Sequence, residues 1–204
     1  MSPVFGKYMS TVRNSKVDNG AEMTEIKKKT LGTVLCGMFA ALITVGAYIK
    51  FHIGAVPFTM QVFFVILAGM MLGRKFGSIS VLVYIAAGLV GIPVFTDGGG
   101  IWYFLNPKFG YIIGFAIAAF VTGYIAFSGK RSYLRCLAAG MAGIAIVYFI
   151  GVIYYWAISY FYLGKSLSFA FLMKWCFLIT LPGDVVSCLL AAFISDRAGK
   201  AVKI

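Results

Sequence analysis

Asp184 is the residue whose type and position point most directly to chemistry. It follows Leu181-Pro182-Gly183 inside an apolar stretch. A carboxylate near the centre of a bilayer costs about 2.5–3.5 kcal/mol even on lenient insertion scales, so a retained one usually faces a polar cavity. Pro182 removes a helical hydrogen bond to the carbonyl of Leu178, and irregular backbone at that depth must line protein or water. We expect Asp184 to contact a ligand, with an ion pair to Lys174 as the alternative.

Gln61 is the second polar side chain that a ligand could meet. It ends the segment Val56-Pro57-Phe58-Thr59-Met60-Gln61, in which Pro57 favours an extended Val56. Gln61 should therefore lie in the first turns of a helix, near the outer surface. A buried interhelical hydrogen bond fits this position as well as ligand contact does.

A second outer segment, from Ile92 to Pro107, contains the run Gly98-Gly99-Gly100 followed by Trp102-Tyr103-Phe104. Glycines permit positive φ and can bring backbone N–H groups against a ligand, or they can simply form a flexible turn. For the aromatic side chains, an interfacial belt is favoured over a pocket wall.

Catalytic chemistry finds little support in the sequence. His52 is the only histidine, and no cluster of His, Cys, Asp or Glu has metal-ligand spacing. No nucleophile–base pair is visible, and the glycine run lacks the Lys-Ser/Thr pair of a nucleotide-binding loop. The four cysteines lie in apolar stretches and are typical of packing residues. We expect no enzyme, no metal and no cofactor.

The elements that position these residues are expected to be membrane-spanning helices. The chain is 61% hydrophobic and only 12% charged, against about 25% charged residues in soluble domains. Spans need about 20 mainly apolar residues, and the sequence predicts an all-α integral membrane protein with six transmembrane helices. They cover about 31–49, 58–72, 76–94, 110–127, 136–161 and 169–194, the last interrupted at Pro182-Gly183.

Charge bias predicts the orientation of these spans. With the N-terminus inside, fourteen of the eighteen basic residues fall on cytoplasmic segments, and only Lys50, Lys108, Lys165 and Lys174 fall outside. Positive charge marks cytoplasmic loops, so both termini should be cytoplasmic, in an inner membrane, and the charge of +12 needs no nucleic acid. We divide the chain into a polar tail 1–30, a membrane domain 31–196 and a tail 197–204.

Small residues recur at four-residue spacing and indicate close helix contacts. Each row fits packing within the protein, and any one of them could instead dock a partner subunit in the membrane. The rows are Gly69, Gly73 and Gly77; Gly110, Gly114 and Ala118; Gly37 and Ala41; and Ala40 and Thr44.

Five segments taken in order resemble the BioY family, the biotin-binding S components of energy-coupling-factor (ECF) transporters. The resemblance spans about residues 31–196. Its carriers are Val56-Pro57-Phe58-Thr59-Met60-Gln61, Leu67-Ala68-Gly69-Met70-Met71-Leu72-Gly73, Gly91-Ile92-Pro93-Val94-Phe95, Pro107 with Gly110-Tyr111, and Leu181-Pro182-Gly183-Asp184.

The resemblance implies a six-helix protein that binds biotin in an outward-facing pocket. It also implies association with a transmembrane coupling subunit and two ATPases. In the family, a small-residue row on the first helix contacts the coupling subunit, and Ala40 and Thr44 would match that row, beside Gly37 and Ala41. Lys108 after Pro107, and Ser187 where a lysine is frequent, depart from the family pattern.

Within that pocket, Asp184 is expected to accept a hydrogen bond from a ureido N–H of biotin, because a charge-assisted bond there is worth roughly 1.5–3 kcal/mol. Asn106 and Gln61 are candidates for the ureido carbonyl. Tyr111, Phe58 and Trp102 are candidates for the ring, and Lys108 or Lys174 for the tail carboxylate.

Two other functions remain open from the sequence. One is a proton-coupled carrier of a small solute in which Asp184 titrates. The other, disfavoured by the missing nucleophile–base pair, is a lipid-modifying membrane enzyme.

Overall fold

The computed structural model describes residues 26–27, 29–51, 58–164 and 168–201. Residues 1–35 and 36–204 form two separate units, and the contacts below lie within the second. The predicted tail up to residue 25, together with His52, Val56 and Pro57, lies outside the described residues.

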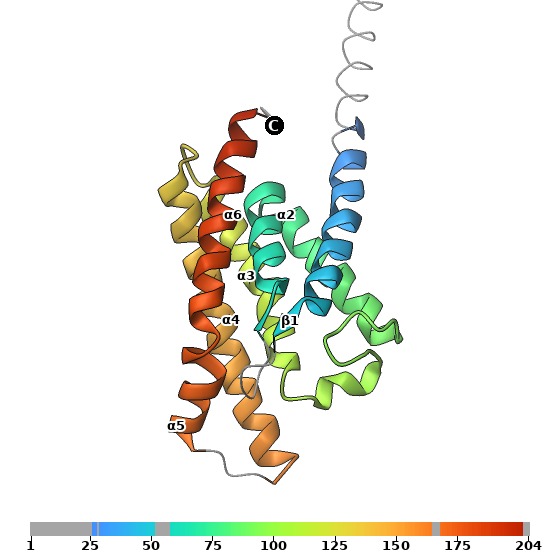
Figure 1. The fold of residues 1–204 in the computed structure, drawn as a ribbon. Helices are drawn as coiled ribbons and strands as arrows, with labels where there is room; N and C mark the ends of the chain where they lie inside the picture. Colours follow the sequence, from blue (N-terminus) through green and yellow to red (C-terminus); the bar gives the residue numbers. More distant parts are fainter. Residues whose placement is uncertain (1–25, 28, 52–57, 165–167, 202–204) are drawn as a thin grey trace, which may run out of the picture. The chain divides into compact units, whose positions relative to one another are not determined.

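The described chain is mostly helical (Figure 1). A helix Lys29–Tyr48 comes first. The elements after it are β1 (Lys50–Phe51), β2 (Phe58–Thr59), α2 (Gln61–Val90), the 3-10 helix η1 (Ile101–Leu105), α3 (Phe109–Phe127), α4 (Tyr133–Phe161), α5 (Phe169–Leu172), the π-helix η2 (Met173–Leu178) and α6 (Leu181–Ala201).

Four helices of the described residues are long and apolar enough to cross a membrane: Lys29–Tyr48, α2, α3 and α4. The predicted helical segments 31–49, 110–127 and 136–161 agree with the first, third and fourth of these within three residues. These four helices agree with the prediction that the chain is an integral membrane protein.

Element α2 bends sharply at Gly73, where the backbone adopts φ 75° and ψ −179°. Residues at similar distances on either side of Gly73 meet. A Cβ added to Gly77 would lie 2.9 Å from Cα of Gly69, and Gln61 Nε2 lies 2.6 Å from the Tyr84 hydroxyl. In a straight helix, residues eight apart are separated by about 12 Å. The element therefore consists of two arms that fold back on each other.

These two arms replace the predicted segments 58–72 and 76–94. The first arm begins at Gln61 because Phe58–Thr59 instead pairs as an antiparallel strand with Lys50–Phe51. The second arm ends at Gly91, whose φ of 112° terminates the helix.

The predicted sixth segment, 169–194, breaks at a different place from the one expected. The chain leaves the π-helix η2 and turns at Ile179-Thr180, and α6 then begins at Leu181. Pro182 is the second residue of α6, where a missing N–H costs nothing. The expectation that Pro182 interrupts the helix was wrong, and α6 continues to Ala201, beyond the predicted end of the sixth segment at about 194.

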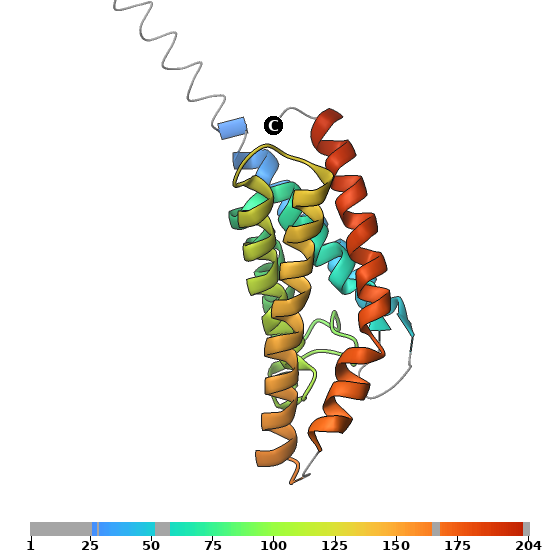
Figure 2. The same ribbon diagram turned by 90° about the vertical axis from the view of Figure 1, so that its left-hand side faces the viewer.

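Helix α3 packs between α2 and α4, and α6 packs against both α2 and α4 (Figures 1 and 2). Glycines allow these approaches. A Cβ on Gly69 would lie 2.6 Å from the Ala119 carbonyl oxygen, and one on Gly110 would lie 2.2 Å from Cβ of Tyr154. The rows that contain Gly69 and Gly110 therefore serve internal packing.

Candidate ligand-binding pocket

A pocket opens among β2, the start of α2, the outer segment 92–108 and helices α3, α4 and α6. It holds about 560 Å³ of space, its open side included. Its wall consists of Phe58, Thr59, Gln61, Val62, Thr96, Tyr103, Lys108, Tyr111, Ile112, Phe115, Val147, Tyr148, Thr180 and Asp184. Most of this wall is apolar or aromatic, with polar groups gathered in a few places, as is usual for small-molecule sites.

Asp184 forms one polar corner of the pocket. It lies in the first turn of α6 and is only 5% exposed. The Tyr148 hydroxyl donates a hydrogen bond to its Oδ2 at 2.5 Å and lies 2.8 Å from the Thr180 hydroxyl. Oδ1 of Asp184 has no hydrogen-bond partner among the described residues. One carboxylate oxygen is therefore available to a donor inside the pocket.

Gln61 forms a second polar corner. Its Nε2 donates to the Tyr84 hydroxyl, and its Oε1 accepts from the hydroxyls of Thr59 at 3.3 Å and Thr96 at 3.4 Å. One N–H of the amide is left for a ligand, since an amide nitrogen carries two. Gln61 thus makes the expected interhelical hydrogen bond and also lines the pocket.

Lys108 and Asp97 lie in the outer segment. Lys108 Nζ is 2.8 Å from Asp97 Oδ2, with both side chains partly exposed at 26% and 34%. Lys108 also lines the pocket. Nearby, burial and the charge of Asp97 raise the pKa of Tyr103 to about 12, so its hydroxyl stays protonated at ordinary pH.

The outer segment is tied to the helices through its backbone. The Tyr48 hydroxyl donates to the Pro93 carbonyl, the Tyr154 hydroxyl donates to the Phe104 carbonyl, and Lys50 Nζ lies 2.7 Å from the Thr96 carbonyl. These bonds hold the segment at the pocket.

The three glycines make a tight turn and do not line the pocket. Gly98 and Gly100 have φ of 114° and 113°, and the Gly100 N–H donates to the Gly88 carbonyl at 2.7 Å. Phe95, 1% exposed, inserts its ring against Gly88, where an added Cβ would lie 2.1 Å from the ring. The glycines therefore pack this turn against α2.

Phe58 and Tyr111 form much of the aromatic wall, and each ring is seated on a glycine. A Cβ on Gly183 would lie 2.4 Å from the Phe58 ring, and one on Gly151 would lie 2.5 Å from the Tyr111 ring. Glycine at these two positions lets α6 and α4 approach the rings closely.

The structure brings five of the eight predicted ligand-contact residues together in this pocket: Asp184, Gln61, Tyr111, Phe58 and Lys108.

The other three predicted residues do not line it. Asn106 Oδ1 accepts from the Lys108 N–H at 3.0 Å and shapes the start of α3. Trp102 is 75% exposed and stacks on Phe104, as a belt residue would. Lys174 occupies an exposed position of η2, and the described hydrogen bond of Asp184 is with Tyr148 instead.

Sequence reasoning did not single out Tyr148, Thr180, Thr59 and Thr96 as lining residues, and it assigned Tyr103 to the belt. Thr180 directly precedes Leu181-Pro182-Gly183-Asp184, and this position next to Asp184 could have identified it as a lining residue. Tyr148 lies within an apolar helix, and nothing in its local sequence distinguishes it. Among the described residues, no three His, Cys, Asp or Glu side chains form a group that could hold a metal ion.

The predicted partner row divides between two faces of the first helix. Gly37 and Ala41 are exposed, and a Cβ added to Gly37 would meet nothing within 4 Å. Ala40 is 8% exposed, and the Thr44 hydroxyl bonds to its carbonyl at 3.0 Å. Only Gly37 and Ala41 therefore present a small-residue surface outward from this unit.

Membrane-length helices around a pocket with separate acceptor and cation corners define a multi-pass membrane protein that binds a small solute. The BioY family model matches residues 16–204, and the chain belongs to the BioY family. It is a membrane transporter component, and the interpretation as a lipid-modifying enzyme is set aside.

Two curated relatives and one solved structure illustrate the similarity. The chain is 40% identical to the "Probable biotin transporter BioY" of Lysinibacillus sphaericus, covering 87% of this chain and 91% of that one. It is 41% identical to the "Biotin transporter BioY" of Thermotoga maritima, covering 82% and 95%. The S-component for biotin from an ECF-type ABC transporter, a crystal structure at 2.1 Å, matches with TM-score 0.73 and 27% identity over 85% of this chain and 93% of that one.

Proposed function

We propose that this chain is the substrate-binding S component of an ECF importer and that it captures biotin in the pocket described above. The observation that carries the proposal is the free Oδ1 of Asp184 in a largely apolar pocket. Biotin presents two ureido N–H donors, a ureido carbonyl, an apolar thioether ring and an acidic tail. The pocket offers a counterpart for each of these groups.

In the proposed complex, Asp184 Oδ1 accepts from a ureido N–H, and the free N–H of Gln61 donates to the ureido carbonyl. Phe58 and Tyr111 cover the bicyclic ring. Lys108 exchanges Asp97 for the tail carboxylate of biotin, because it already lines the pocket and needs only to change its acceptor. Asn106, Trp102 and Lys174 have weaker support, since they lie away from the lining.

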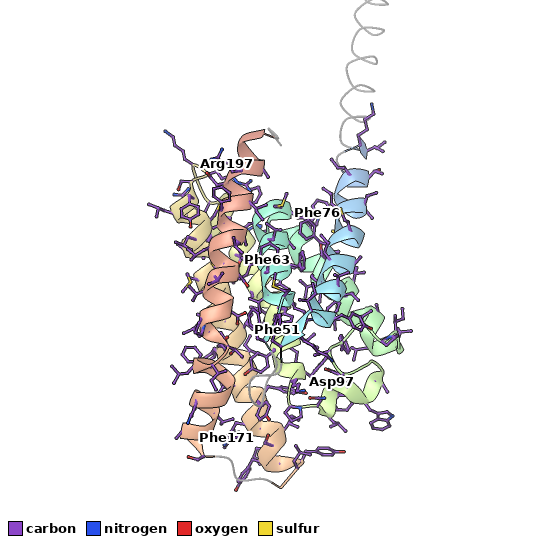
Figure 3. The ribbon with its side chains drawn as sticks, viewed as in Figure 1. Phe51, Phe63, Phe76, Asp97, Phe171 and Arg197 are labelled. Atoms are coloured by element: carbon purple, nitrogen blue, oxygen red, sulfur yellow. The ribbon has the colours of Figure 1, made fainter. Side chains whose placement is uncertain are left out.

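We also infer six membrane crossings with both termini in the cytoplasm. The helix Lys29–Tyr48, the two arms of α2, α3, α4 and the α5-η2-α6 segment supply six crossings in sequence. In Figure 3, Arg197 lies near the top of the second unit, whereas Asp97 lies in its lower half. Arg131 lies near Arg197, since its Nη2 donates to the Ser195 hydroxyl, and Phe76, next to Arg74 and Lys75, lies on the same side in Figure 3. Positive charge marks cytoplasmic segments, so we assign this end to the cytoplasm.

The remaining subunits of the importer would be a transmembrane coupling protein and two ATPases. The exposed Gly37 and Ala41 are the proposed contact with the coupling protein, since small residues permit close helix packing within a bilayer. The chain itself has no nucleotide-binding loop, so energy for import would come from these partners.

The test is equilibrium binding of labelled biotin to the detergent-purified chain. Asp184→Asn should weaken binding about 10- to 100-fold, because an amide replaces the charged acceptor of a buried hydrogen bond. Asp196→Asn makes the same change at the other end of α6 and should leave affinity unchanged. An Asp184→Asn affinity within threefold of wild type would contradict the assignment. No saturable binding by the wild type in several mild detergents would contradict the proposed ligand.

A further inference from the structure

A second cavity lies at the opposite end of the unit from the biotin pocket, where α2 bends and α3 ends. We call it the basic groove. It holds about 730 Å³ of space, its open side included. Its lining residues are Leu72, Gly73, Arg74, Lys75, Gly123, Tyr124, Phe127 and Ser128. Phe76, next to the basic pair, lies on the Arg197 side of the unit, away from Asp97 (Figure 3).

The backbone of the bend forms the floor of the groove. A Cβ on Gly123 would lie 2.4 Å from the Arg74 backbone nitrogen, so α3 packs directly on the bend. A Cβ on Gly73 would have only the Phe127 ring nearby, at 3.7 Å. Two glycines thus fix the floor, and side chains of Arg74, Lys75, Tyr124 and Phe127 build the walls.

The groove combines positively charged side chains with an apolar aromatic surface. Arg74 and Lys75 supply positive charge, and the Arg74 guanidinium carbon lies 5.8 Å from the Tyr124 ring centroid, a cation–π distance. Tyr124 and Phe127 are 54% and 53% exposed and supply an apolar surface beside these cations. A ligand that fits has an anionic group joined to an apolar body.

The positive charge of the groove is not balanced within the described chain. None of the lining residues is acidic. Among the described residues, neither Arg74 nor Lys75 pairs with a carboxylate. Basic pockets between transmembrane helices on the cytoplasmic side typically bind anionic lipid head groups. Phe76, next to Arg74 and Lys75, lies on the same side of the unit as Arg197 (Figure 3), and Arg131 lies there too, since its Nη2 donates to the Ser195 hydroxyl.

We propose that the basic groove binds the phosphate of an anionic phospholipid. Arg74 and Lys75 contact the head group, and Tyr124 and Phe127 pack against the glycerol backbone and the first methylene groups of the acyl chains. Arg74 is held over Tyr124, which leaves guanidinium N–H groups for a phosphate oxygen. The site is independent of biotin capture.

The proposal is tested by native mass spectrometry of the detergent-purified chain titrated with phosphatidylglycerol or with phosphatidylcholine. Wild-type protein should retain phosphatidylglycerol preferentially. Arg74→Gln and Lys75→Gln should each lower its apparent affinity about fivefold, and the double variant about 20-fold, since each cation near an anionic surface contributes on this scale. Arg74→Lys keeps the charge and should lose less than Arg74→Gln.

Lys130→Gln is the matched control, because Lys130 is exposed on the same side and does not line the groove. Biotin binding by every variant reports that the fold is intact. Equal retention of the two lipids by wild type, or a double variant that behaves like Lys130→Gln, would overturn the proposal. Displacement of the lipid by millimolar inorganic phosphate would assign the site to free phosphate. If the Arg74→Gln and Lys75→Gln variants failed to assemble with the other ECF subunits but retained the lipid as wild type does, the groove would be assigned to a protein partner instead.

Discussion

Tyr148 determines which oxygen of Asp184 faces the pocket. Its hydroxyl occupies Oδ2 at 2.5 Å and fixes the orientation of the carboxyl group, so that Oδ1 is presented to the pocket. A side chain that rotates freely would pay an ordering cost when biotin binds. Tyr148 therefore acts as a positioning residue in the proposed site.

Tyr148→Phe should weaken biotin binding about fivefold, because it removes one hydrogen bond worth roughly 1 kcal/mol and leaves the carboxyl group less constrained. Titration calorimetry or binding of labelled biotin checks this. Tyr160→Phe deletes a hydroxyl from an exposed position of the same helix and should have no effect. A Tyr148→Phe affinity within twofold of wild type would show that orientation of Asp184 does not depend on this bond.

A substitution at Lys108 tests the proposed contact with the acidic tail of biotin separately from the proposed contacts with its ring. Lys108→Gln should weaken biotin binding about threefold and leave binding of biotin methyl ester unchanged, because partly exposed ion pairs contribute little and are screened by salt. Parallel titrations of both ligands at low and high salt measure the difference. Equal losses for acid and ester would mean that Lys108 acts through packing and not through charge.

At the scale of elements, the bend of α2 depends on a single glycine. Gly73 adopts φ 75° with ψ −179°, a region open essentially to glycine alone. Gly73→Ala should destabilise the protein by about 1–3 kcal/mol and lower the midpoint of thermal unfolding by about 2–10 °C. An added Cβ would meet only ordinary contacts at 3.7 Å, so the cost is conformational.

The control for this substitution is Gly37→Ala, at a helical position where an added Cβ meets nothing within 4 Å. Alanine is favoured over glycine in a helix, so its unfolding midpoint should stay level or rise. Similar losses for the two variants would show that the bend is not set by the backbone of residue 73.

The limits of sequence reasoning are clearest at the same elements. Apolar length predicted the helices, and Gly73 fell between two predicted spans. No local signal in the sequence indicated that these two spans would follow each other without a loop. The sixth span was expected to be interrupted at Pro182-Gly183 because proline breaks helices in their interior, whereas the structure places Pro182 in the first turn of α6, where proline is tolerated. Asp184 was accessible to sequence reasoning because a carboxylate in an apolar stretch is costly. Tyr148 was not, since its role depends on packing between α4 and α6.

At the scale of the whole molecule, substrate capture and partner contact should be separable. Gly37→Leu and Ala41→Leu place bulk on an exposed helix face far in sequence from Asp184. Each should abolish or strongly reduce co-purification with the coupling subunit and ATPases, and leave biotin affinity unchanged, because close helix approach needs small residues. Pull-down of the co-expressed complex gives the first quantity and labelled biotin the second. Intact assembly by both variants would move the contact elsewhere.

The ion pair between Lys108 and Asp97 has a consequence for how selective the pocket is toward acids. A carboxylate that enters the pocket must displace Asp97 from Lys108, because Asp97 Oδ2 already lies 2.8 Å from Lys108 Nζ and neutralises its charge. The gain is then a difference between two attractions of similar strength, and the displaced Asp97 must be rehydrated. Discrimination therefore falls mainly on the ureido head, and neutral derivatives of the vitamin should compete almost as well as the vitamin itself.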